Sequence, residues 1–206
     1  ALLPFLLMEV GVDTYNASDI KYSAMSLLGR TDKPNFVTST EPDVKKINFL
    51  YPQIMYHTLQ RYRWGFARKY TELTKSTTVT GGKYKNNFTL PADFLYLRGC
   101  YSDNRYKASI RERDLNVVDS VINTDSETCY IEYTRYVDEA KLPMYFIEYI
   151  KIKLAFDACM DITGDTDLLQ ILDKREQFEW INATNIDARQ QRVKELDTGV
   201  FVNVRG

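Results

Sequence analysis

The spacing of hydrophobic positions changes twice along the chain, from helical to alternating and back to helical. Apolar residues recur every three or four positions within residues 16–28, which predicts a short helix. The same criterion predicts a second, longer helix from Thr40 to between Tyr62 and Trp64. Pro52 falls inside this helix, where a proline removes one backbone hydrogen bond, and we expect a kink there.

Residues typical of helix ends flank both segments. Asn16 or Ser18 is expected to cap the first helix, and Gly29 suits the position just after its last turn. The hydroxyl of Thr40 is expected to cap the second helix, with Pro42 in its first turn. The two helices therefore have support beyond their hydrophobic spacing.

From Tyr70 onward, β-prone residues are interrupted by turn residues. The best strand candidate covers residues 128–137, because hydrophobic and polar side chains alternate through it. We predict further strands in four segments, which are residues 71–80, 83–89, 94–101 and 105–111. The first two of these would form a hairpin around Gly81 and Gly82. Residues 114–122 are ambiguous.

Helical spacing returns at Pro143, a favoured residue for the first helical position, and continues to Ile162. Residues 163–165 end this helix and cap the next, which is expected over 166–196. Gly199 would end the last helix, with a short extended tail beyond it. Because only three residues separate these two helices, we expect them to pack as an antiparallel pair.

The order of helices, then strands, then helices predicts an α+β fold. In it, the N- and C-terminal helices form a helical bundle that carries an inserted antiparallel β-sheet domain. The expected parts are an N-terminal arm at 1–15, a helical domain at 16–69 and 142–197, an inserted β domain at 70–141, and a C-terminal tail at 198–206. Trp64, Phe66 and Pro91 are expected to form the structural hinge where helix meets sheet.

Composition allows a packed core but gives little direct indication of function. The 206 residues are 44% hydrophobic with a net charge of −1, so the strong basic charge of a duplex-binding domain is missing. Fifteen tyrosines and ten phenylalanines suit either strands and core or protein interfaces.

The first ten residues are mostly apolar, yet too short to span a bilayer and without the basic start of a secretory signal. We expect them to dock on the core or on a neighbouring subunit, and we expect no membrane association. The chain starts at Ala1 instead of Met, so either residues precede it or its start was processed.

Residues that carry chemistry are sparse. His57 is the sole histidine and falls within a predicted helix, which argues against a Ser-His-Asp or Cys-His arrangement. Aspartates at 161, 165 and 167 do not match the spacing of a calcium loop, and Gly81-Gly82-Lys83 does not match a phosphate loop. We therefore expect no catalytic residues, no bound metal and no cofactor.

Three cysteines, about 30 residues apart, contain no C-x-x-C pair and suggest neither a zinc site nor a disulfide framework. Reduced, partly buried thiols are the expected state. Cys100 and Cys129 both fall in predicted strands and could be neighbours, which would not by itself make them bonded.

Four basic residues surround Trp64, namely Arg61, Arg63, Arg68 and Lys69. As candidate DNA-facing residues, they would combine positive charge with an aromatic ring. As purely structural residues, they would stabilise the negative end of the preceding helix. The sequence favours the structural interpretation and leaves the other open.

Several short motifs, in order and at characteristic spacing, resemble the tail tubular protein A family, the head-to-tail adaptors of short-tailed bacteriophages. The similarity covers about residues 17–190. The motifs are Leu27-Leu28-Gly29, Tyr51-Pro52, Trp64-x-Phe66-Ala67, Leu90-Pro91-x-Asp93, Tyr96-x-Arg98, Ile131-x-Tyr133, Leu142-Pro143-x-x-Phe146, Leu154-Ala155, Thr163-Gly164-Asp165 and Asp187-Ala188-Arg189. Gly65 departs from the pattern, which has a more polar residue there.

This resemblance implies a structural virion protein without catalytic activity, located in the neck or tail and assembled in the host cytoplasm. It would form a homo-oligomeric ring, commonly of twelve subunits, between the portal protein and the tail nozzle. Genomic DNA would pass through the ring without sequence-specific binding, which suits the near-neutral charge.

Two other functions stay open at this stage. One is a tail-associated cell-wall hydrolase that uses a pair among the 28 acidic residues. The other is a nucleic-acid-binding module built on the four basic residues around Trp64.

Overall fold

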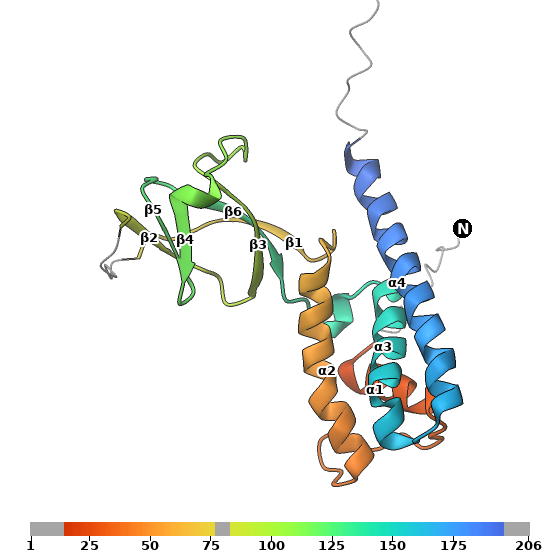
Figure 1. Ribbon diagram of the computed structural model, residues 1–206. Helices are drawn as coiled ribbons and strands as arrows, with labels where there is room; N and C mark the ends of the chain where they lie inside the picture. Colours follow the sequence, from red (N-terminus) through yellow and green to blue (C-terminus); the bar gives the residue numbers. More distant parts are fainter. Residues whose placement is uncertain (1–14, 77–82, 196–206) are drawn as a thin grey trace, which may run out of the picture.

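The computed structural model describes residues 15–76 and 83–195, which form a mixed α+β protein (Figure 1). Four α-helices occur in that part, namely α1 Ala17–Leu27, α2 Pro42–Arg61, α3 Met144–Ile162 and α4 Thr166–Glu195. Six strands form two antiparallel sheets, namely β1 Arg68–Glu72, β2 Asn86–Thr89, β3 Phe94–Tyr101, β4 Leu115–Val118, β5 Val121–Thr124 and β6 Tyr130–Arg135. Most of the expected N-terminal arm, the Gly81-Gly82 turn and the C-terminal tail lie outside the described residues.

The ends of α1 match the sequence prediction. Asn16 is the N-cap, and its side chain accepts the Asp19 N–H at 3.0 Å while Asp19 accepts the Asn16 N–H at 3.2 Å. Gly29 follows the last turn with φ +93°, a backbone conformation that favours glycine. Asn16 is thus the cap among the two predicted alternatives, and Ser18 lies inside the helix.

The start of α2 differs from the prediction by one residue. Glu41, and not Thr40, is the N-cap, and no side chain caps the helix. The reason is Pro42, the first helical residue, because a proline restricts the residue before it to extended backbone. The helix continues through Pro52 to Arg61, and the kink stays a prediction.

Helix α3 lies at the centre of the helical part and contacts α1, α2 and α4. It begins at Met144, one residue later than predicted, with Pro143 as the N-cap. After the turn at Gly164, the Asp165 side chain accepts the N–H groups of Asp167 and Leu168 at 2.9 and 3.0 Å and so caps α4. Figure 1 shows α4 running back alongside α3, as the short connection predicts.

The two sheets have the strand orders β1-β6-β3 and β2-β5-β4. The prediction for 94–101 coincides with β3, and β6 occupies the middle of the predicted 128–137. Thr71 and Glu72, at the start of the predicted 71–80, belong to β1 and pair with β6. Further along, Lys75 forms an antiparallel bridge with Phe88, as the predicted hairpin requires, and two backbone hydrogen bonds flank this bridge.

The strand predicted at 105–111 is reduced to a single antiparallel bridge between Ser109 and Tyr101, and the rest of the segment is a loop. Asp103 Oδ1 accepts the N–H groups of Lys107 and Ala108 at 3.0 and 2.7 Å, and this closes a loop. Residues 114–122, ambiguous in the sequence, include β4 and the tight turn that joins it to β5.

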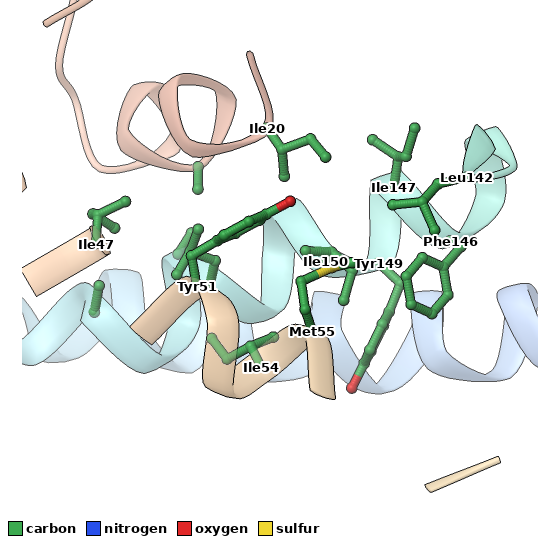
Figure 2. Close-up of a cluster of buried hydrophobic side chains, with 14 of the residues drawn as sticks. Ile20, Ile47, Tyr51, Ile54, Met55, Leu142, Phe146, Ile147, Tyr149 and Ile150 are labelled. Carbon is green, nitrogen blue, oxygen red and sulfur yellow. The ribbon is translucent and has the colours of Figure 1, made fainter. Parts of the chain in front are cut away.

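The buried hydrophobic residues divide into a helix cluster, centred on α3, and a strand cluster. The strand cluster consists of Leu73, Phe88, Leu90, Cys100, Ile122, Cys129, Ile131 and Tyr133. Figure 2 shows the helix cluster, where side chains from α1, α2 and α3 interdigitate. Two of its tyrosines carry their hydroxyls to acidic partners, since Tyr51 donates to Glu139 at 3.0 Å and Tyr149 donates to Glu176 at 2.7 Å. Buried rings thus keep their polar ends paired.

No helix within 15–76 and 83–195 is long and apolar enough to cross a membrane.

Candidate interaction surfaces

The segment between α2 and β1 is held by an aromatic cluster centred on Trp64. The Trp64 ring is fully buried and its Nε1 donates to the Thr58 carbonyl at 2.8 Å. Its ring neighbours, with centroids within 6.5 Å, are Tyr62, Phe66, Tyr145, Phe146 and Trp180. Of the three residues predicted as a hinge, Trp64 and Phe66 therefore lie together, whereas Pro91 lies in the turn between β2 and β3.

Asp187 on α4 holds the same segment from the other side. Its carboxylate, almost fully buried, accepts the Gly65 N–H on both oxygens at 3.1 and 2.9 Å. It also accepts from the Tyr145 hydroxyl at 2.8 Å and from the Gln191 amide at 2.6 Å. Asp187 thereby joins α3, α4 and the segment before β1.

Gly65 makes this close approach possible. A Cβ at this position would lie 2.8 Å from Cγ of Gln191, closer than carbon atoms pack. The Gln191 amide also donates to the Arg63 carbonyl at 3.1 Å. The departure of Gly65 from the family pattern thus has a local packing reason in this chain.

The structure separates the four basic residues that were predicted as DNA-facing. Arg61 lies over the Trp180 ring at 4.2 Å, and Lys69 pairs with Asp93 at 2.9 Å. Arg63 and Arg68 instead lie near a third arginine, Arg98.

Arg98 connects the sheet to the aromatic cluster. Its Nη2 donates to the Trp64 carbonyl at 2.7 Å and its Nε donates to Thr134 Oγ1 at 2.8 Å. Burial lowers the pKa of its guanidinium, and the charges of Arg68 and Arg63 lower it further against the opposing effect of Glu132. In the sequence, Arg98 stands out only through the Tyr96-x-Arg98 motif, and its place in a basic group was not predicted.

Beside these arginines lies a group of partly exposed tyrosines, here called the tyrosine face. It comprises Tyr70 on β1, Tyr101 on β3, Tyr130 on β6 and Tyr106 in the loop after β3. The Tyr106 ring contacts the other three edge-on, with centroid distances of 4.7, 5.4 and 6.1 Å. The opposite side of the sheet packs on the strand cluster, so this side faces solvent.

Two backbone features shape the tyrosine face. Tyr106 has φ +57°, which an aromatic residue rarely adopts and which places its ring among the other three. A Cβ at Gly99 would lie 2.7 Å from the hydroxyl oxygen of Tyr101, so this glycine lets the Tyr101 side chain lie across the strand.

The helices carry two further exposed apolar surfaces. Ile171, Phe178 and Ile181 are each more than half exposed and lie on the side of α4 away from its buried residues; we call them the α4 stripe. Phe49 and Tyr56, seven positions apart, form the α2 stripe on the outer side of α2. Figure 1 shows α2 and α4 on either side of α3.

His57 lies beside a groove of about 330 Å³ between α2 and α3, which Lys153 and Asp157 also line. Within the described part of the chain, no three His, Cys, Asp or Glu side chains are placed to hold a metal ion. The exposed aromatic and apolar surfaces are therefore the features from which function can be argued.

No protein-family model matches this chain, and no curated protein matches its sequence. The resemblance to the tail tubular protein A family rests on the sequence motifs alone.

Proposed function

We propose that this protein is a structural subunit of a closed ring, the head-to-tail adaptor of a short-tailed bacteriophage. The ring, of about twelve copies by the family resemblance, would join portal and tail nozzle and surround the DNA exit channel. In this proposal the helices form a bundle that builds the ring, and the β domain, inserted at the Trp64–Phe66 hinge, projects toward a partner.

The observation that carries the proposal is the pair of unlike apolar stripes on α2 and α4. A ring forms by head-to-tail contact, in which one surface of each subunit binds a different surface of the next. The α2 stripe is aromatic and lies beside Gln53 and Gln60, whereas the α4 stripe is largely aliphatic. Because they lie on different sides of α3, each subunit could bind two neighbours at once.

The tyrosine face suits contact with a second kind of protein. Tyrosine and arginine are enriched in the parts of protein interfaces that contribute most to binding. Tyr70, at 45% exposure, brings ring surface to solvent beside Arg68, whose guanidinium lies 5.8 Å from the centroid of that ring. The portal or the nozzle would dock here, with burial of the tyrosine rings as the main favourable term.

Native mass spectrometry of the full chain, alone and with portal, tests the ring. We expect oligomers of one defined size, either alone or on the portal, and their loss in Phe178→Asp, which buries a charge in the proposed contact. Gln177→Asp adds the same charge beside it on α4, on an exposed polar residue, and should assemble normally. A wild-type chain that stays monomeric in both conditions would refute the proposal.

A second function, binding of single-stranded nucleic acid, is favoured by the tyrosine face together with Arg63, Arg68 and Arg98. Bases stack on exposed aromatic rings while cations contact the phosphates. Arg68→Ala should then weaken binding of a labelled oligonucleotide several-fold and reduce the salt dependence of the affinity. Arg61→Ala and Lys69→Ala serve as controls, because these two side chains are engaged elsewhere. Equal loss in all three variants would point to nonspecific attraction.

A further inference from the structure

Two of the three cysteines lie against each other inside the strand cluster. The sulfur atoms of Cys100 and Cys129 are 3.3 Å apart, although the residues are 29 positions apart in the sequence. Cys100 is on β3 opposite Ile131, and Cys129 comes just before β6, so adjacent strands hold the two thiols together. Both side chains are buried, with 2% and 0% exposure.

We propose that Cys100 and Cys129 are an oxidation site, which a small hydroperoxide converts to an intramolecular disulfide linking β3 to the start of β6. Two buried thiols in contact, with no third metal-binding side chain placed beside them in the described part of the chain, lack the donors of a metal centre. At 3.3 Å, the two sulfur atoms are already within about 1.3 Å of the length of a disulfide bond.

The reaction balances with hydrogen peroxide as the oxidant. The sulfur of Cys100 attacks one peroxide oxygen, the O–O bond breaks, and the products are a sulfenic acid and one water. The sulfur of Cys129 then displaces the hydroxyl from that sulfenic acid, forming the S–S bond and a second water. Two thiols and one peroxide thus give one disulfide and two waters, with sulfur oxidised and peroxide oxygen reduced.

The environment assigns an order to the two sulfurs. The hydrogen bond between the two thiols lowers the pKa of Cys100, and the same contact, with burial, raises the pKa of Cys129. Because the thiolate is the nucleophile, Cys100 reacts with peroxide first and Cys129 resolves the sulfenic acid.

The third cysteine provides an internal control. Cys159 on α3 is equally buried, and its neighbours are Thr163 Oγ1 at 3.5 Å and the Asp165 carbonyl at 3.7 Å. Without a second thiol beside it, Cys159 can be oxidised but cannot close a disulfide within the folded chain. Burial alone therefore does not distinguish the three residues, whereas the thiol neighbour does.

The test uses the full-length protein, reduced, freed of reductant and treated with hydrogen peroxide. After quenching, the chain is unfolded, alkylated with N-ethylmaleimide and weighed by mass spectrometry. We expect one alkylated cysteine, a loss of two hydrogen masses, and a cross-linked peptide pair containing Cys100 and Cys129. Cys159→Ala should lose the remaining alkylation and keep the cross-link, whereas Cys100→Ala and Cys129→Ala should each abolish the cross-link.

A second measurement is the midpoint temperature of thermal unfolding, compared between the oxidised and the reduced protein. Cross-linking positions far apart in sequence restricts the unfolded chain, so the oxidised protein should unfold about 5–10 °C higher than the reduced protein. Three alkylated cysteines after peroxide treatment would overturn the proposal. The proposal would also be overturned if the free thiol of Cys159 were lost at the same rate as those of Cys100 and Cys129, because that would mean oxidation of an unfolded chain.

Discussion

At the scale of single residues, Asp187 links α4 to α3 and to the segment before β1. Four hydrogen bonds converge on a carboxylate that is almost fully buried, from Gly65, Tyr145 and Gln191. In the sequence, Asp187 appears within the Asp187-Ala188-Arg189 motif of a predicted helix, with no sign of its hydrogen-bond partners. Its partner Gly65 is 122 positions away, so a role that depends on this contact could not be predicted from local pattern.

Asp187→Ala is expected to lower the free energy of unfolding by about 2–4 kcal/mol, because it leaves buried donors without an acceptor. Urea unfolding followed by fluorescence measures this change. Asp173→Ala is the matched control on the same helix. This variant loses one exposed hydrogen bond, which the Gln177 amide donates to Asp173, and should lower the free energy of unfolding by less than about 0.5 kcal/mol. Equal effects in the two variants would mean that the buried contacts of Asp187 contribute nothing.

Asp93 predicts a specific dependence of stability on pH. Burial tends to raise its pKa, but hydrogen bonds from Lys69 and Tyr133 outweigh this, and the pKa lies below the ordinary 3.8. The unfolded chain therefore takes up the proton at higher pH than the folded one. Asp93 thus stabilises the fold above the unfolded pKa, and this contribution is lost as the pH falls through the folded pKa.

We therefore expect the difference in stability between wild type and Asp93→Asn to shrink as the pH falls from about 5 to about 2.5. Urea unfolding at several pH values measures it. In a Lys69→Gln background, which lacks the ion pair with Asp93, the difference should vary less with pH. A difference that grows toward low pH would reverse the sign and contradict the assignment.

At the scale of elements, the helices were predicted more closely than the strands. Caps such as Asn16 and Asp165 act on backbone groups two or three residues away, so a local pattern contains the signal. Strand pairing depends on distant partners, and β1 pairs with β6 across more than 50 intervening residues. The tyrosine face was missed for the same reason, because its four rings come from three strands and a loop.

The β4–β5 hairpin contains a strained turn that the sequence did not reveal. Asp119 and Ser120 have φ of 47° and 62°, so both turn residues are left-handed without being glycine. A two-residue hairpin of this kind favours Asn-Gly. The double substitution Asp119→Asn, Ser120→Gly is expected to raise the free energy of unfolding by about 0.5–1.5 kcal/mol, seen as a higher thermal midpoint. Ser120→Val should lower it, and a fall in both variants would contradict the turn geometry.

At the scale of the whole molecule, the placement of the apolar surfaces matters more than any one residue. The α2 stripe and the α4 stripe lie on helices that flank α3, and the tyrosine face lies on the sheet. Helical spacing predicted the two helices themselves, but not these exposed stripes. Phe49 and Phe178 lie on the outer sides of their helices. Their exposure was not predicted, because phenylalanine is usually a core residue and the sequence does not show which phenylalanines stay in solvent.

If the ring forms by head-to-tail contact, two variants that each lack a different stripe should form one contact with each other when they are mixed. Phe49→Asp keeps the α4 stripe and Phe178→Asp keeps the α2 stripe, so neither variant alone can assemble. Mixed in equal amounts, they retain one intact contact between the two proteins and should form a heterodimer that does not grow, because the remaining surfaces are both blocked. Native mass spectrometry of isotope-labelled mixtures distinguishes this species from homodimers. Homodimers of a single variant would instead indicate a self-complementary contact, in which the same surface of two subunits meets, and the head-to-tail arrangement would be wrong.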